Sequence, residues 1–245
     1  MIFLTIFSIL IVLAELSVAM INSIAGIIFD SIALLGLINY IVFVGESRFQ
    51  KTAFALALIP LLRILSLAVP LIQVPEIYWY VLVGVPFLGT MFLFSRYARF
   101  SWDNLRLKLG AVPSQLVVGL SGIPFGLAAF EILRPKPLPI SSSWISLGIA
   151  ALILFLFVGF LEEVLFRGIL QRAALDTFGS LGIILVSVIY GFVYSGSLSI
   201  IYILFVAITG WLYALWVKRS GSLWGSITAR SLWNIGLILI WPLIL

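Results

Sequence analysis

The chain has 245 residues, of which 63% are hydrophobic and only 9% are charged. This composition excludes a water-soluble domain, because soluble proteins carry about 25% charged side chains. The net charge of +5 does not indicate nucleic acid, since membrane proteins also gather lysine and arginine on their cytoplasmic side. The sequence therefore predicts an integral membrane protein that contacts membrane lipid and binds no nucleic acid.

Short polar, proline-containing or glycine-containing joints divide the chain into about nine apolar runs, each near the length of about 20 residues that crosses a bilayer as a helix. The runs are Ile2–Met20, Ile24–Val44, Ala53–Leu71, Ile77–Phe94, Leu116–Leu133, Trp144–Phe166, Leu181–Tyr194, Leu198–Trp216 and Leu223–Leu245. We expect an all-α, polytopic bundle of about eight to nine transmembrane helices. No linker long enough to separate domains occurs, which predicts a single transmembrane domain over residues 1–245.

Lysine and arginine fall mostly on alternate joints, and therefore on one side of the predicted bundle. These residues are Arg48, Lys51, Arg96, Arg99, Arg106, Lys108, Arg172, Lys218 and Arg219, and the exceptions are Arg134 and Lys136. The side that carries most of the positive charge faces the cytoplasm in membrane proteins. This distribution predicts a multi-pass protein whose N-terminus is cytoplasmic.

The absence of cysteine and histidine limits the chemistry. It excludes a disulfide framework, a thiol nucleophile and the usual zinc ligands, and we predict neither a metal nor a cofactor. A transporter is another class to consider, because Pro60, Pro86 and Gly210 are each able to interrupt a helix. They form no matched pair between two halves of the chain, so the pattern does not favour a transporter.

Charged residues inside the apolar runs are the informative ones, because each costs about 2.5 to 3.5 kcal/mol at the centre of a membrane helix. They are Glu15, Asp30, Arg63, Glu131, Glu162, Glu163, Arg167 and Arg230. Asp30 and Arg63 stand on successive antiparallel runs, and we expect them to form a structural ion pair if their depths match, with Glu15 nearby.

The stretch FLEEVLFRGILQRA, residues 160–173, concentrates three of these charges. Glu163 and Arg167 are four residues apart and share one helix face, whereas Glu162 points about 100° away. One carboxylate is therefore neutralised locally, and the other must meet a different helix. A carboxylate left free inside a bundle can act as a general base toward water.

The run EEVLFR, residues 162–167, resembles the E-E-x-x-x-R motif of the CAAX prenyl protease and bacteriocin-processing (CPBP) family of polytopic intramembrane endopeptidases. The stretch VSVIYGFVYSG, residues 186–196, stands where that family has F-x-x-x-H. The stretch GSLWGSITARSLWN, residues 221–234, resembles the family's H-x-x-x-N motif and the segment before it. The resemblance covers residues 157–236.

Both motif histidines are replaced here. Tyr194 stands for the first and Arg230 for the second, whereas Asn234 is retained. In the family, the first glutamate and the first histidine activate water, and the later histidine and asparagine stabilise the oxyanion. The resemblance therefore implies Glu162 as the base and Asn234 as an oxyanion donor.

The resemblance also implies that Glu163 and Arg167 form a supporting pair. With Arg230 present, two carboxylates face two guanidinium groups. An arginine remains protonated in proteins, so we expect Arg230 to pair with Glu162 and to make it a poor base.

Our first hypothesis is consequently a catalytically impaired pseudo-protease, which acts as a membrane scaffold or regulator toward a membrane-associated peptide or protein. The alternative is an active endopeptidase that cleaves a membrane-associated peptide at a cavity open to the cytoplasmic side. In that reading Glu162 is the base, Arg230 and Asn234 hold the oxyanion, and Tyr194 donates a proton. A phenol is a poor substitute for imidazole near neutral pH, which counts against the alternative.

Overall fold

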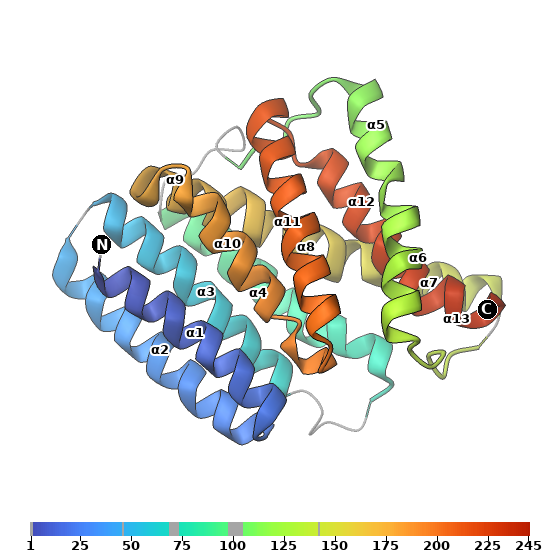
Figure 1. The fold of residues 1–245 in the computed structure, drawn as a ribbon, viewed down its shortest axis with the longest axis horizontal. Helices are drawn as coiled ribbons and strands as arrows, with labels where there is room; N and C mark the ends of the chain where they lie inside the picture. Colours follow the sequence, from blue (N-terminus) through green and yellow to red (C-terminus); the bar gives the residue numbers. More distant parts are fainter. Residues whose placement is uncertain (1, 46, 69–73, 98–104, 142) are drawn as a thin grey trace.

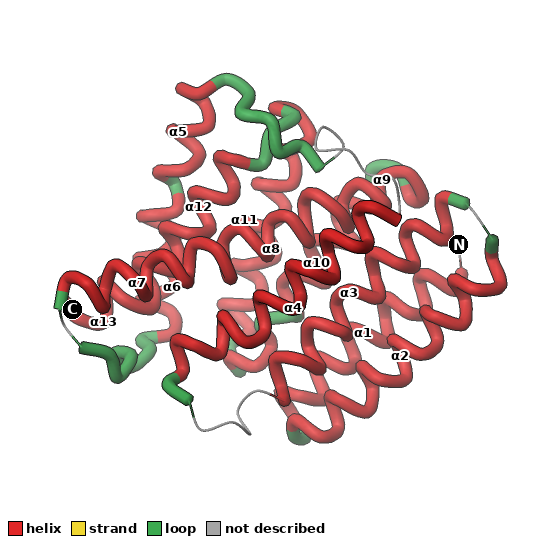
Figure 2. Tube along the Cα trace, turned by 180° about the vertical axis from the view of Figure 1, so that it is seen from behind, coloured by secondary structure: helices red, strands yellow, loops and turns green. Residues whose placement is uncertain are grey.

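The computed structural model describes residues 2–45, 47–68, 74–97, 105–141 and 143–245, and every regular element within these ranges is helical. The helices form a bundle in which α1, α2 and α3 lie side by side at one end (Figure 1). Their bounds are Ile2–Met20, Ser23–Val44 and Arg48–Ala68. Figure 2 shows the same arrangement from behind, with helices making up most of the described chain and loops joining them.

The remaining helices follow in chain order. They are α4 (Glu76–Tyr97), α5 (Val112–Leu120), α6 (Gly122–Leu133), α7 (Trp144–Leu154), α8 (Leu161–Glu163), α9 (Gln171–Phe178), α10 (Leu181–Phe192), α11 (Ile200–Ser220), α12 (Trp224–Ile235) and α13 (Trp241–Ile244). Helices α5 and α6 form one span, and α7 to α9 form another. In the described residues, eight spans are long and apolar enough to cross a membrane, and Leu181–Ser197 is a shorter apolar segment. The predicted helix bundle is confirmed.

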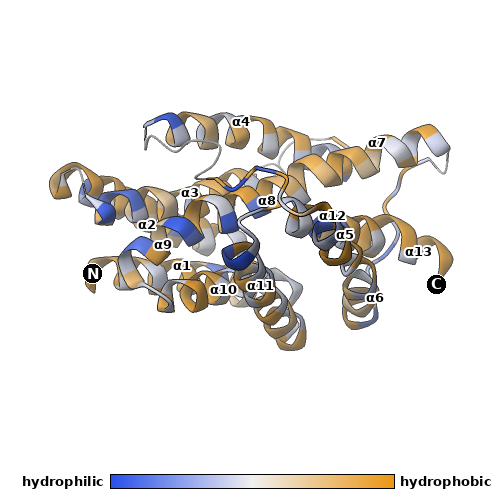
Figure 3. Cartoon of the chain, turned by 90° about the horizontal axis from the view of Figure 1, so that it is seen from above, coloured by the Kyte–Doolittle hydropathy of each residue, from blue (hydrophilic) through white to orange (hydrophobic). Residues whose placement is uncertain are grey.

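The outer surface of the bundle is apolar. Figure 3 shows hydrophobic residues along most of the helices that face outward. Large side chains such as Phe43, Leu93 and Ile145 are more than half exposed, which would be costly in water and is favourable in lipid. Together with the lengths of the spans, this surface identifies an integral, multi-pass membrane protein.

The residues considered as helix interruptions do not break their helices. Pro60 lies inside α3, Pro86 inside α4 and Gly210 inside α11, and each of these helices is continuous within its bounds. The discontinuous helices that transporters use near the membrane midplane are therefore not formed at these positions. Two residues named in the sequence predictions, Leu71 and Arg99, lie outside the described part of the chain.

The expected pair between Asp30 and Arg63 is not the one that forms. The Nε atom of Arg63 lies 2.6 Å from Oε1 of Glu15, whereas neither carboxylate oxygen of Asp30 has a hydrogen-bond partner. Arg63 on α3 lies next to both α1 and α2, which carry Glu15 and Asp30. Its Nε contacts the carboxylate on α1. Sequence spacing alone does not decide which of two carboxylates on neighbouring helices an arginine contacts.

Candidate functional site

The candidate site begins on a helix of unusual geometry. Helix α8 is a single turn, and a π-helical stretch lies on each side of it, at Phe155–Phe160 and Val164–Leu170. A π-helix widens the backbone and is often found at functional sites. Glu162 and Glu163 therefore stand on a short α-helical turn whose two flanks depart from the regular helical spacing.

Glu163 and Arg167 form the local pair that their spacing predicts. Nε of Arg167 lies 3.7 Å from Oε2 of Glu163, and both side chains are buried. The guanidinium of Arg167 also lies 4.0 Å from the ring centre of Tyr190, a distance at which a cation is attracted to the aromatic face. Gly210 on α11 makes room for this arrangement, because a Cβ there would lie 2.8 Å from both Arg167 and Tyr190.

Glu162 turns away from that pair and toward α10 and α12. Its Oε2 accepts hydrogen bonds from the hydroxyl of Tyr190 at 2.9 Å, from the hydroxyl of Tyr194 at 2.8 Å and from Nε of Arg230 at 3.1 Å. Its Oε1 lies 2.6 Å from the Tyr194 hydroxyl. We call Glu162, Tyr190, Tyr194 and Arg230 the Glu162 cluster.

Arg230 is held from several directions. Its Nε contacts Glu162, and its Nη2 donates to the hydroxyl of Tyr194. The guanidinium lies 4.8 Å from the ring centre of Tyr194 and 4.7 Å from that of Trp233. The pairing expected from charge counting therefore forms, but through one nitrogen rather than two, because Tyr194 takes the second donor.

The close approach of α12 to the helix that carries Glu162 depends on Gly159. A Cβ at Gly159 would overlap the hydroxyl of Ser231, and it would lie 2.9 Å from the Cα of the same residue. Asn234, one turn beyond Arg230, donates its side-chain amide to the Arg230 carbonyl at 2.8 Å and is buried. Its amide donor is thus directed at its own helix in this structure.

Arg230 and Glu162 differ in the exposure of their side chains. The side chain of Arg230 is 2% exposed, whereas that of Glu162 is 16% exposed. Glu163, by contrast, is completely buried. Of the two adjacent carboxylates, Glu162 is therefore the one with exposed surface.

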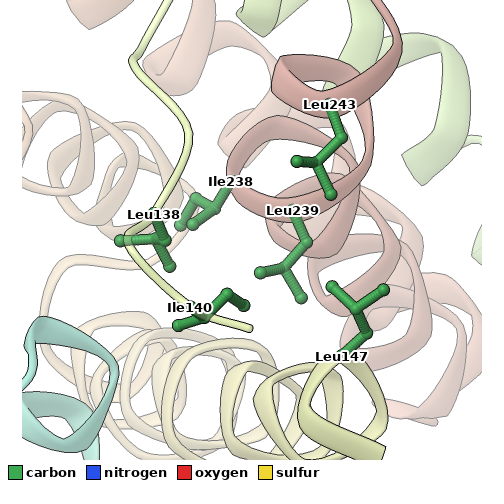
Figure 4. A pocket seen from close by; sticks show the side chains of 6 residues that line it. All are labelled: Leu138, Ile140, Leu147, Ile238, Leu239 and Leu243. Atoms are coloured by element: carbon green, nitrogen blue, oxygen red, sulfur yellow. The ribbon is translucent and has the colours of Figure 1, made fainter. Parts of the chain in front are cut away.

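A separate apolar pocket lies away from these charges. Its lining consists of Leu138, Ile140, Leu147, Ile238, Leu239 and Leu243 (Figure 4). The lining side chains come from the segment before α7, from α7 itself and from the end of the chain around α13. No titratable side chain lines it, so this pocket offers shape and hydrophobic contact but no acid or base.

The described residues contain no group of three or more histidine, cysteine, aspartate or glutamate side chains that would hold a metal ion. At the candidate site, the Glu162 carboxylate contacts a guanidinium and two phenols, and Glu163 faces Arg167. Neither carboxylate is arranged with further oxygen ligands around a common point. The chemistry that these residues support is hydrogen bonding and charge pairing.

Three contributors to the site were not assigned a role from the sequence. Tyr190 lies within the stretch VSVIYGFVYSG, at the position of the motif's phenylalanine, and its hydroxyl donates to Glu162. The sequence contains an indication of this role, because a tyrosine in place of the motif's phenylalanine adds a hydrogen-bond donor. Gly159 and Gly210 act through the space that they leave, which becomes visible only when the facing helices are in place.

Comparison with known families gives one result. Residues 143–236 match the family model described as type II CAAX prenyl endopeptidase Rce1-like. Both carboxylates, both arginines of the site, Tyr194 and Asn234 fall within this range. The comparisons with curated proteins and with solved structures gave no match.

Proposed function

Because the chain is a membrane protein with an Rce1-like domain of the CPBP family over residues 143–236, we propose that it is a non-hydrolytic member that acts as a membrane scaffold or regulator. The observation that carries this proposal is the occupation of Glu162. Arg230 and two tyrosine hydroxyls contact the carboxylate that the family motif makes the base.

A general base needs a lone pair that faces water. Three donors of its own chain contact the Glu162 carboxylate. They are the hydroxyl of Tyr190, the hydroxyl of Tyr194, which shares its one proton between the two carboxylate oxygens, and Nε of Arg230. The guanidinium of Arg230 neutralises its charge as well, so removing a proton from water becomes less favourable. Loss of a matched general base typically lowers a rate by about 10² to 10⁴.

The proposed role is binding rather than cleavage. The family acts on peptides that reach the membrane, and a site that keeps the fold while losing the base retains a surface for such a peptide or for a membrane protein. Glu162, Tyr190 and Arg230 would then stabilise the packing of α8 against α10 and α12. We place the N-terminus and the basic joints on the cytoplasmic side, following the charge distribution of the sequence.

A second function is favoured by one observation, the partial exposure of the Glu162 side chain. If Arg230 turned away, Glu162 would take a proton from water, and the hydroxide would attack a peptide carbonyl. Arg230 and Asn234 would then stabilise the oxyanion, and Tyr194 would protonate the leaving amine. This route requires the contacts of the Glu162 cluster to break before each reaction.

The test is peptide cleavage by the full-length chain in lipid vesicles. The probe is a prenylated peptide with a C-terminal CAAX sequence, and the products are detected by mass spectrometry. We expect the wild type to give no more product than Glu162→Gln. The double variant Tyr194→His/Arg230→His, which supplies both family histidines, is expected to cleave and so to validate the probe. Product formed by the wild type and lost in Glu162→Gln would overturn the proposal.

A further inference from the structure

A second group of buried charges lies among the first three helices, outside the Rce1-like domain. Glu15 on α1 and Asp30 on α2 are completely buried, and the side chain of Arg63 on α3 is 15% exposed. We call these residues the N-terminal charge cluster. Both carboxylates project into a helix interface whose other buried residues are small or apolar.

The contacts within this cluster are unequal. Arg63 and Glu15 form a close ion pair, with Nε 2.6 Å from Oε1. Asp30 interacts electrostatically with both of them, but neither of its carboxylate oxygens accepts or donates a hydrogen bond. The residues that share its buried helix face are Gly26, Ala33, Leu37 and Ile41.

Charge counting then leaves one group unbalanced. If all three groups are ionised, two carboxylates face one guanidinium, and the excess negative charge is buried. The other charged residues on the described parts of α1 and α3 are Arg48 and Lys51, which stand in the first turn of α3, far along the helix from Arg63. An uncompensated charge at such a position costs several kcal/mol, so a counterion is required.

A metal cation does not fit this position. Hard cations take about six to eight oxygen ligands, and the described residues contain no cluster of three or more acidic or other metal-binding side chains. The backbone carbonyls near Asp30 are engaged within continuous helices. A proton requires only one oxygen and no coordination shell.

We propose that the N-terminal charge cluster is a proton-binding site in which Asp30 carries an exchangeable proton while Glu15 and Arg63 remain an ion pair. The proton comes from water and returns to water, so the step is the reversible conversion of a carboxylate to a carboxylic acid. Arg63 provides the contact with the surroundings, because it is the one member that is partly exposed.

The proton site is distinct from the Glu162 cluster but adjoins it. Ser195, the residue after Tyr194, donates its hydroxyl to the backbone carbonyl of Glu15 at 2.7 Å. Ser195 is buried and opens the turn Ser195–Ser197 that precedes α11. The proposal does not rest on the proposed function, since an active and an inactive protease site would leave these three charges unchanged.

The experiment is infrared difference spectroscopy of the full-length protein in lipid nanodiscs over a range of pH. We expect the wild type to show the C=O stretch of a carboxylic acid in an apolar setting at neutral pH, and Asp30→Asn to lack it. Glu15→Gln should also lose the band although Asp30 is present, because Asp30 then faces Arg63 alone and ionises. Glu162→Gln should keep it. The absence of the band in the wild type, or its survival in Asp30→Asn, would overturn the proposal.

The pH dependence of thermal stability supplies a second readout, because the slope can be compared between variants whose stabilities differ. At neutral pH the folded state holds a proton on Asp30, whereas the unfolded chain does not. The free energy of unfolding of the wild type should therefore fall as pH rises. Asp30→Asn should flatten this dependence. Replacing choline chloride by sodium chloride should have no selective effect. Stabilisation of the wild type by sodium, absent in Asp30→Asn, would show a metal cation instead and would refute the proton site.

Discussion

Replacing Arg230 by methionine tests whether it is bound to Glu162 as the structure shows. The substitution keeps an unbranched side chain and removes the guanidinium that contacts Glu162, Tyr194 and the ring of Trp233. Breaking one partner of a buried ion pair costs about 3 to 5 kcal/mol. We expect the lower end, about 3 kcal/mol, because two tyrosine hydroxyls still donate to Glu162.

A double-mutant cycle isolates the pair from its surroundings. Glu162→Gln alone leaves Arg230 with a tyrosine hydroxyl and aromatic faces as partners, and it should also destabilise the protein. The double variant Glu162→Gln/Arg230→Met removes both charges. Its loss should be smaller than the sum of the single losses, with a coupling energy on the order of 2 kcal/mol.

The assay is reversible unfolding of the purified protein in mixed micelles, followed by tryptophan fluorescence. Arg134→Met is the matched control, because Arg134 and Glu131 also form an ion pair, at 2.9 Å, but their side chains are 76% and 52% exposed. Solvent screens such a pair, and we expect a loss below about 1 kcal/mol. Additive losses at Glu162 and Arg230 would refute the reasoning, since they would mean that the two residues do not interact.

Two further predictions concern packing and hydrogen bonding at the same site. Gly159→Ala should reduce the free energy of unfolding by about 1 to 3 kcal/mol, because the new Cβ would meet the backbone of α12. Gly148→Ala is the control, because the space around Gly148 is open. Unfolding in mixed micelles measures both variants, and equal effects would contradict the close packing at Gly159. Tyr190→Phe should reduce the free energy of unfolding by about 1 to 2 kcal/mol, because it removes a hydrogen-bond donor to Glu162. Tyr78→Phe, at a half-exposed position, should leave it unchanged. The same unfolding assay measures both, and an unchanged stability in Tyr190→Phe would show that the hydroxyl does not hold the carboxylate.

The spans and the local pair of the site could be predicted from sequence because they depend on short-range spacing. Apolar runs of membrane-crossing length became the helices observed, and the spacing of Glu163 and Arg167 put them on one face. The partnership of Arg230 with Glu162 followed from charge counting combined with the family motif. These inferences need only helix geometry and the cost of an unpaired charge.

The remaining features depend on how helices meet, which spacing does not encode. Arg63 contacts Glu15 rather than Asp30, although both carboxylates lie on helices next to α3. The single contact between Arg230 and Glu162, in place of a bidentate one, arises because the Tyr194 hydroxyl lies within reach. The π-helical stretches around α8 have no proline or other marker at their boundaries that would announce them.

Arg230 and two tyrosine hydroxyls hold Glu162, and this occupation is the reason that we expect it to be a poor base toward water. A cryo-electron microscopy map of the protein in lipid nanodiscs, at a resolution that shows ordered water, tests this directly. We expect the map to place Arg230 Nε near 3.1 Å from Glu162 Oε2, within hydrogen-bonding distance. Both tyrosine hydroxyls should contact the carboxylate, and no ordered water should be bound to it. An ordered water on Glu162, with Arg230 turned away, would contradict the account and favour the protease.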